Sequence, residues 1–183
     1  GAYVGIAHPA WYSLTLADAL TIEAAHAVEV YNQTCAAHND RGESWYMSEA
    51  LAARGRRLHA FAADDAHFRP ERPDSFGGWV QVRAEALAPA ALLAALKAGH
   101  YYASQGPELH DIRVAGDSLA VACSPARAIF ISGPGSRSEY CHGEGLTAAD
   151  LPLTRFRGGY CRVTVVDAAG RLSGSRPSRS RRP

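Results

Sequence analysis

Two groups of residues in this sequence follow strand-like segments and have side chains of the types that can bind divalent metal ions. His8 follows residues 2–7, and Asp65 and His67 follow residues 58–63. Side chains alternate along an extended segment, so Asp65 and His67 are expected to point the same way and chelate one ion. A bound divalent ion activates water for hydrolysis, and this is the chemistry that the pattern indicates.

Each of these residues also has an ordinary structural interpretation. A histidine before a proline is more often a hydrogen-bonded turn residue than a ligand, so His8 taken alone is assigned to a turn. For Asp65 and His67, the metal-binding and structural interpretations carry about equal weight. Glu29 stands in a strand of β-branched residues and either serves a site, faces solvent or pairs with an arginine. Trp11 is most simply a core or rim residue, although its position also suits a pocket wall.

The elements that would position these residues alternate between strand and helix. Strands are expected over residues 2–7, 27–31, 58–63 and 77–82, and helices over 15–25, 45–54 and 89–98, with a loop over 32–43. Thr15 with Asp18 predicts a capping box, and Pro89 and Gly99 are typical of a helix start and stop. The alternation indicates an α/β sheet or barrel, in which functional groups gather at the carboxyl ends of parallel strands.

The pattern changes from about residue 106 onwards. Short strands are expected at 112–114, 119–123, 128–132 and 160–166, separated by turn residues and without a helix, which indicates a small antiparallel β unit over 106–170. Residues 171–183 combine Arg, Ser and Pro with few apolar side chains, and this composition predicts a disordered tail. The predicted α/β part therefore covers residues 1–105.

Composition excludes several classes of protein. Residues 171–183 hold five arginines and no acid, so residues 1–170 contain 14 basic against 18 acidic side chains. A mildly acidic body disfavours general nucleic-acid binding, which depends on Lys and Arg neutralising phosphates. No segment reaches the roughly 18 apolar residues of a membrane span. The four cysteines form no C-x-x-C pair, which favours ordinary thiols in a reducing cytoplasm.

Several short motifs are shared with one known family. They are AHP at residues 7–9, VEVYN at 28–32, AADDAHF at 62–68, GGWV at 77–80, LLAALKAG at 92–99, YYASQGP at 101–107 and YCRVTVVDAAGR at 160–171. Taken together they resemble the later part of the PHP domain, the polymerase and histidinol phosphatase superfamily. Any one of these motifs alone would carry little weight.

The resemblance implies a fold of the α/β class, a partial and distorted (β/α)7 barrel of the PHP type followed by a small antiparallel β unit. It also implies a metal-dependent phosphoesterase that holds two or three zinc, manganese or iron ions. The metal ligands implied are His8, Asp65 and His67, and residues assigned near the site or to substrate contact are Glu29, Asn32, Asp64 and Trp11. The expected substrate is a small phosphate ester or a nucleotide.

Part of the family's ligand set is missing from this sequence. The opening H-x-H strand and the middle Glu and His ligands are expected before the AHP motif, and only seven residues precede His8. We therefore expect a C-terminal fragment of a phosphoesterase that holds at most one ion weakly and is inactive alone. An α/β part of about 105 residues is also short for a barrel of roughly 200 residues. Its open sheet edge would favour self-association.

Two other functions fit the sequence. One is a non-catalytic binding or interaction protein in which the antiparallel unit over 106–170 carries the function. The other is a different metal hydrolase, such as an amidohydrolase, because the same ligand types occur at barrel strand ends in such enzymes.

Overall fold

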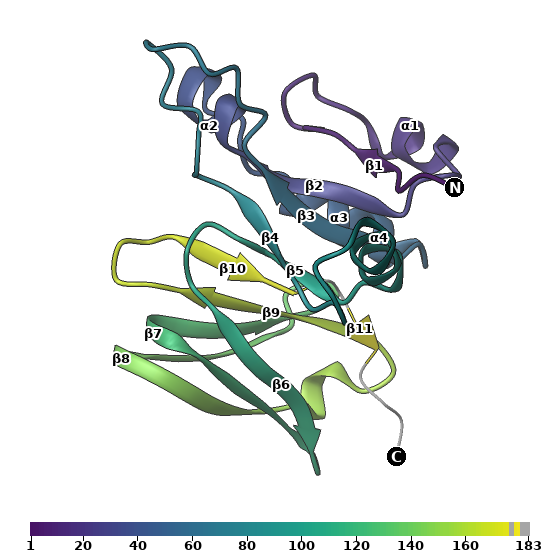
Figure 1. Ribbon diagram of the computed structural model, residues 1–183. Helices are drawn as coiled ribbons and strands as arrows, with labels where there is room; N and C mark the ends of the chain where they lie inside the picture. Colours follow the sequence, from purple (N-terminus) through teal and green to yellow (C-terminus); the bar gives the residue numbers. More distant parts are fainter. Residues whose placement is uncertain (176–177, 180–183) are drawn as a thin grey trace. The chain divides into compact units, whose positions relative to one another are not determined.

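The chain divides after Ala103 into two units with separate cores. The computed structural model describes residues 1–175 and 178–179 (Figure 1). The first unit contains β1 (Gly5–Ile6), α1 (Leu16–Thr21), β2 (Ala27–Asn32), α2 (Gln33–Asn39), α3 (Trp45–Ala53), β3 (His59–Ala63), β4 (Trp79–Val82) and α4 (Pro89–Ala98). It ends in β5 (Tyr101–Ser104), whose last residue already belongs to the second unit.

A parallel sheet in the order β1-β2-β3 forms the centre of the first unit. Gly5 pairs with Ala27, and Ala27 in turn pairs with His59 on the other side. The register of β2 against β3 shifts between Glu29 and Tyr31. Because all three strands run the same way, the segments that follow β1, β2 and β3 leave the sheet at one edge.

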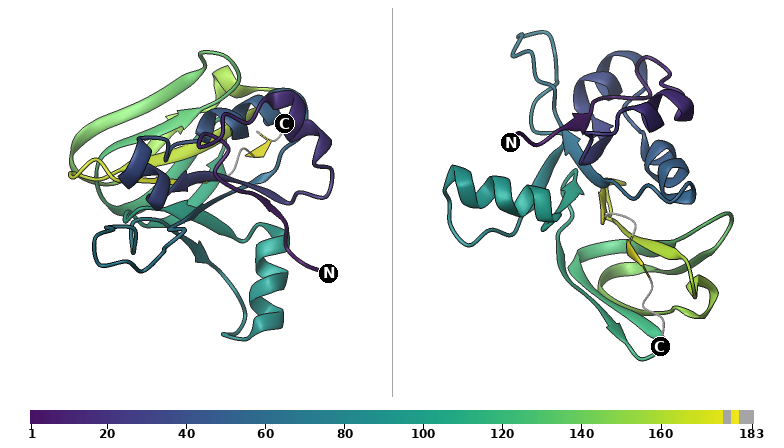
Figure 2. Two further views of the ribbon diagram at one scale, coloured as in Figure 1. Left: turned by 90° about the horizontal axis from the view of Figure 1, so that it is seen from above. Right: turned by 90° about the vertical axis from the view of Figure 1, so that its right-hand side faces the viewer.

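Helices close the apolar core beneath this sheet. Met47 and Leu51 of α3 are buried together with Val28 and Val30 of β2, and Ala19 of α1 belongs to the same cluster. Figure 2 shows α4 on the other side of the unit from α1 and α3. Burial of this apolar face, rather than helix propensity, stabilises helices as short as α1.

Local capping signals were predicted correctly from the sequence. Thr15 and Asp18 form the predicted capping box at the start of α1. α4 begins at Pro89, and Gly99 ends it in the left-handed conformation, with φ of 72°. The helix expected over 15–25 is shorter than predicted, because α1 ends at Thr21.

The predicted partial (β/α)7 barrel is wrong. The structure is mixed α/β, but antiparallel strands dominate it, and four α-helices are found in the described part of the chain. Parallel neighbours need a crossover connection, usually a helix. The described segment between β3 and β4, residues 64–78, has no helix, so the strand–helix alternation needed for a barrel is interrupted after β3.

The second unit is antiparallel. It contains β6 (Leu109–Ala115), β7 (Ser118–Ser132), β8 (Ser138–Pro152), a 3-10 helix (Thr154–Phe156), β9 (Tyr160–Val166), β10 (Leu172–Gly174) and β11 (Ser178–Arg179). β7 is its central strand and pairs with β6, β8 and β9. The ladder between β7 and β8 is irregular around Ala126, next to Pro125, because proline has no N–H to donate.

β8 and α2 were not predicted from the sequence. β8 covers 15 residues, yet Gly143, Gly145 and exposed polar side chains hide its strand character. Within the tail predicted to be disordered, Leu172–Gly174 pair with β9, and Ser178–Arg179 also pair with it. The rest of that prediction, for 176–177 and 180–183, lies outside the described residues.

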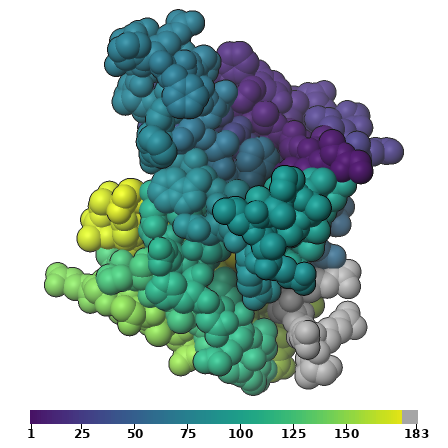
Figure 3. All heavy atoms as spheres, viewed as in Figure 1, coloured from purple at the N-terminus to yellow at the C-terminus, as the bar shows by residue number. Residues whose placement is uncertain are grey.

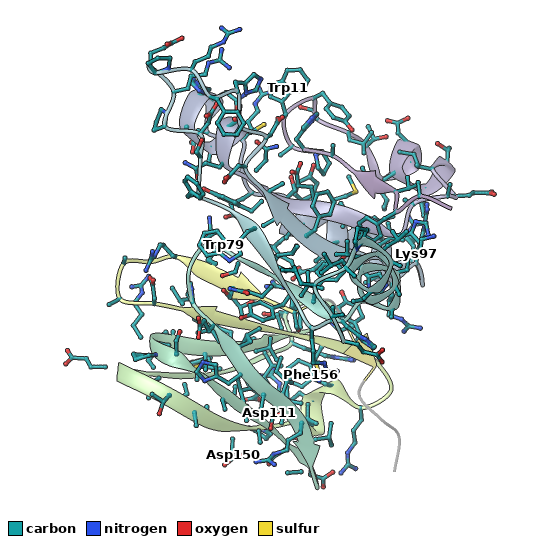
Figure 4. The ribbon with its side chains drawn as sticks, viewed as in Figure 1. Trp11, Trp79, Lys97, Asp111, Asp150 and Phe156 are labelled. Atoms are coloured by element: carbon teal, nitrogen blue, oxygen red, sulfur yellow. The ribbon has the colours of Figure 1, made fainter. Side chains whose placement is uncertain are left out.

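Phe156 is the largest fully buried side chain and lies in the core of the second unit (Figure 4). We expect Phe156→Ala to lower the free energy of unfolding by about 3–5 kcal/mol, because it removes a buried ring and leaves a cavity. Urea unfolding followed by circular dichroism measures this change. Tryptophan fluorescence is unsuitable for the second unit, because all three tryptophans lie in the first unit. Phe76→Ala is the matched control: Phe76 is 89% exposed, and its loss should change stability by less than about 0.5 kcal/mol.

Asp167 gives the second unit a pH-dependent contribution to stability. Burial by itself raises the pKa of Asp167. The backbone N–H and the guanidinium of Arg171 together lower it by more than burial raises it, so the net pKa lies below its usual range. Stability from this pair is therefore present above the unfolded-state pKa and is lost as the pH falls through the folded-state pKa. We expect Asp167→Asn to be less stable than the parent chain at pH 7. The two unfolding midpoints should converge in acid, and a constant difference across the titration would contradict this account.

Candidate functional site at the end of the parallel sheet

A cleft of about 380 Å³ opens at the end of the parallel sheet in the first unit. Its lining residues are His8, Trp11, Thr34, Cys35, His38, Asn39, Asp65, His67 and Arg72. The three predicted metal ligands therefore line one cleft, although 57 to 59 residues separate His8 from the other two. Trp11, which is 50% exposed, lies at the top of the unit in Figure 4.

The strand ends explain why these residues meet. His8 follows β1, Asn32 ends β2, and Asp65 and His67 follow β3. Parallel neighbours place their carboxyl ends at one edge, so residues distant in sequence lie around one opening. α2 begins directly after β2 and contributes Cys35 to the wall of the cleft.

Asn32 connects the predicted site residues through its side-chain amide. Its Nδ2 donates to both carboxylate oxygens of Glu29 and to Oδ2 of Asp65, each at 3.3 Å. Its Oδ1 accepts from the backbone N–H of Cys35 at 2.8 Å and so caps α2. Glu29 is only 3% exposed and also accepts from the backbone N–H of His8. Glu29 thus does not face solvent and forms no ion pair within the described part of the chain; it holds the turn at His8.

The turn at His8 leaves one ring nitrogen without a partner. The carbonyl of His8 accepts from the backbone N–H of Trp11 at 3.0 Å, and the rings of Trp11 and Tyr12 contact the imidazole edge to face. Nδ1 of His8 is buried and has no hydrogen-bond partner in the described part of the chain. A buried nitrogen of this kind is costly unless something else bonds to it.

Two of the predicted ligands have a strained backbone. His8 has φ of 28° and Asp65 has φ of 53°, which is the left-handed region that favours glycine. Such residues cost on the order of 1 kcal/mol or more and persist where neighbouring contacts hold them, often at functional sites. The backbone N–H of His8 donates to Glu29, and the carbonyl of Asp65 accepts from Thr34 Oγ1 at 2.7 Å.

Burial and the charges of Glu29 and Asp65 disfavour further negative charge next to these two carboxylates. Burial raises the pKa of Glu29, the contacts with His8 and Asn32 lower it, and the charge of Asp65 raises it again, for a net rise. Burial, followed by the charges of Asp65 and Glu29, raises the pKa of the Cys35 thiol to about 11. Cys35 is therefore protonated near neutral pH and is not a thiolate nucleophile. A field that disfavours further negative charge attracts cations.

The segment from Asp64 to Gly78 runs beside α2 (Figure 1) and contributes Asp65, His67 and Arg72 to the cleft lining. In the space-filling view it lies at the surface, at the upper left (Figure 3). The carboxylate of Asp64 accepts from the backbone N–H groups of Phe76, Gly77 and Gly78 at 2.6–2.8 Å. Asp64, predicted as a residue near the site, thus closes this segment into a loop. Gly77 passes so close to Gln33 that a Cβ there would lie 2.0 Å from its Oε1.

Part of the cleft lining comes from a segment expected to be a loop, residues 32–43. This segment forms α2 instead, which brings Thr34, Cys35, His38 and Asn39 to the lining. The available signal was Asn32 as an N-cap, because residues one turn apart then share a helix face. Asp74, which contacts His67 and Thr34, was also missed.

The residues present have the donor types that a divalent ion needs. His8 Nδ1 is unpartnered in the described part of the chain. The carboxylate of Glu29 accepts from the backbone N–H of His8, and Asp65 lines the same cleft as His8. Across residues 1–175 and 178–179, however, no three His, Cys, Asp or Glu side chains are grouped so that they could already hold an ion. The donor chemistry fits a metal, whereas a complete ligand set is not assembled in the described residues.

Comparison with protein-family models, curated proteins and solved structures found no match for this chain. The resemblance to the PHP family therefore stays a prediction from the motifs. Within the described residues, no helix is long and apolar enough to cross a membrane.

Asp64 should control how often the 64–78 loop opens. Losing one hydrogen bond to a charged group costs about 1.5–3 kcal/mol, so Asp64→Ala should increase opening at least about tenfold. Limited chymotrypsin digestion measures this through cleavage after Phe68 and Phe76, which are 81% and 89% exposed. Asp150→Ala, at an exposed position in the second unit, is the control. Equal cleavage rates for both variants would refute the closing role of Asp64.

Proposed function

We propose that the cleft binds a divalent metal ion and a phosphate ester, as part of a metal-dependent phosphoesterase centre of the PHP type. The observation that carries this proposal is the buried Nδ1 of His8, which has no partner in the described part of the chain, in a cleft that Asp65 and His67 also line. Imidazole with carboxylates is a donor set that suits zinc, manganese and iron.

Each residue has a distinct role in this proposal. His8, Asp65 and His67 would hold the ion, and Asn32 orients Asp65 by donating to its Oδ2. Glu29 fixes the backbone of His8. A bound ion would supply a water of lowered pKa and would neutralise charge on the phosphoryl oxygens. Arg72 lines the same cleft and offers a guanidinium to those oxygens.

The carboxylates of Glu29 and Asp65 disfavour phosphate binding when no ion is bound. Glu29 and Asp65 raise the pKa of the neighbouring Cys35 thiol in addition to the effect of burial, and the same charges repel a phosphate dianion. A divalent cation held by His8, Asp65 and His67 would offset this repulsion. We therefore expect phosphate to bind only when the metal is present.

Three protein ligands are enough for one ion with water in an open position. They do not position two ions about 4 Å apart, as two-metal hydrolysis requires. We propose that this chain by itself holds one ion weakly and turns over little substrate. The proposed substrate is a small phosphate ester or a nucleotide. The four cysteines are free thiols, which supports a cytoplasmic location for the proposed enzyme.

Metal binding by the 183-residue chain tests this function. We expect titration calorimetry with Mn²⁺ or Zn²⁺ to show one site, and Asp65→Asn and His8→Ala to weaken it at least about tenfold, as is typical of losing a ligand or its support. Inorganic phosphate should then bind the parent chain with Mn²⁺ present and not after chelation.

His110→Ala is the matched control for this experiment. His110 is exposed in the second unit and contacts Glu108, so its loss should leave Mn²⁺ affinity unchanged. Absence of any saturable site for Mn²⁺, Zn²⁺ or Fe²⁺ would refute the proposed function. Rapid metal-dependent hydrolysis of a phosphate ester by this chain would instead contradict its expected low turnover.

A further inference from the structure

Asp74 is a fully buried carboxylate in the loop that carries His67. Its side chain is 0% exposed, and its Oδ2 lies 3.4 Å from Nδ1 of His67. The same oxygen accepts from the backbone N–H of His67 at 3.1 Å and from Oγ1 of Thr34 at 3.3 Å. One carboxylate oxygen therefore contacts both the main chain and the ring of His67.

A carboxylate beside one ring nitrogen decides which nitrogen carries the proton. A neutral imidazole has one N–H donor and one acceptor, and Asp74 Oδ2 can only accept. The proton on the His67 ring is therefore favoured on Nδ1. Nε2, on the other side of the ring, then keeps its lone pair free to bind a metal ion. His67 lines the cleft and its side chain is 40% exposed, so this ring is accessible there.

Thr34 joins this pair to the rest of the site. Its Oγ1 also lies 2.7 Å from the carbonyl oxygen of Asp65, and its backbone N–H donates to the carbonyl of Asp64 at 3.0 Å. The start of α2 thus contacts the chain at Asp64 and Asp65 and, through Asp74, the position of His67. A change in the position of Asp74 would therefore affect His67 directly and Asp65 through Thr34, and both residues are proposed to hold the ion.

We propose that Asp74 is a positioning residue that holds His67 in the Nδ1-protonated tautomer, with Nε2 presented to the cleft for a divalent ion. This proposal rests on the metal-binding function above, but its structural part does not need a metal. Ligating histidines commonly donate their other ring N–H to a carboxylate, and loss of that partner typically costs 10–100-fold in metal affinity.

The tautomer of His67 tests the proposal directly. Long-range ¹H–¹⁵N NMR spectra of the metal-free chain, recorded above the pH at which imidazole titrates, separate protonated from unprotonated ring nitrogens. His67→Gln assigns the signals by removing them. We expect Nδ1 protonated and Nε2 unprotonated in the parent chain, and a shift toward the Nε2-protonated form in Asp74→Asn. A purely loop-closing role for Asp74 would leave the tautomer unchanged.

Thr34→Val is the matched variant, because it removes one contact to Asp74 and keeps the carboxylate. We expect the parent tautomer in Thr34→Val, and Mn²⁺ affinity 10–100-fold lower in Asp74→Asn. A parent chain whose His67 is protonated on Nε2 overturns the proposal, even if Asp74→Asn fails to fold. If the parent chain binds no Mn²⁺, the phosphoesterase function fails, whereas the tautomer result still decides the role of Asp74.

Discussion

The candidate site depends on the hydrogen bonds that the side-chain amide of Asn32 makes. Its oxygen caps α2, and its nitrogen donates to Glu29 on the same strand and to Asp65 after the next strand. An amide presents an acceptor and a donor on one rigid plane. A carboxylate at this position would add a third negative charge, and a hydroxyl would be too short to reach all three partners. The position therefore favours asparagine.

The site holds unfavourable features that its neighbours must offset. Glu29 is buried although burial raises its pKa, and His8 and Asp65 both have positive φ. Each of these features costs free energy in the folded state. The contacts that offset the cost are specific: Glu29 accepts from the His8 main chain, and Thr34 contacts the Asp65 carbonyl. Strained residues that are held by specific contacts from neighbouring strand ends are often found at functional sites.

Capping residues in the sequence correctly predicted those helix ends that depend on interactions between near neighbours along the chain. Thr15 with Asp18, and Pro89 with Gly99, mark helix ends through their own hydrogen bonds and backbone angles, and both predictions are confirmed. β8 depends on pairing with β7 along its whole length, and strand preference is weak where partners decide the outcome. The barrel prediction failed for a related reason. Alternation of elements indicates their type, whereas the connection after β3 determines which strands become neighbours.

The site residues that directly follow a strand could be predicted from the sequence. Those whose positions depend on the path of a loop could not. His8, Asp65 and His67 come within a few residues of β1 or β3, so a parallel sheet brings them to one cleft. Asp74 lies eleven residues beyond β3. No periodic pattern in the sequence predicts that its carboxylate contacts His67. Asp64 and Asp65 show the same limit at closer range. They are adjacent in sequence, but one binds the 76–78 backbone and the other receives the Asn32 amide. Their different roles follow from the path of the loop, which is fixed by contacts far along the chain.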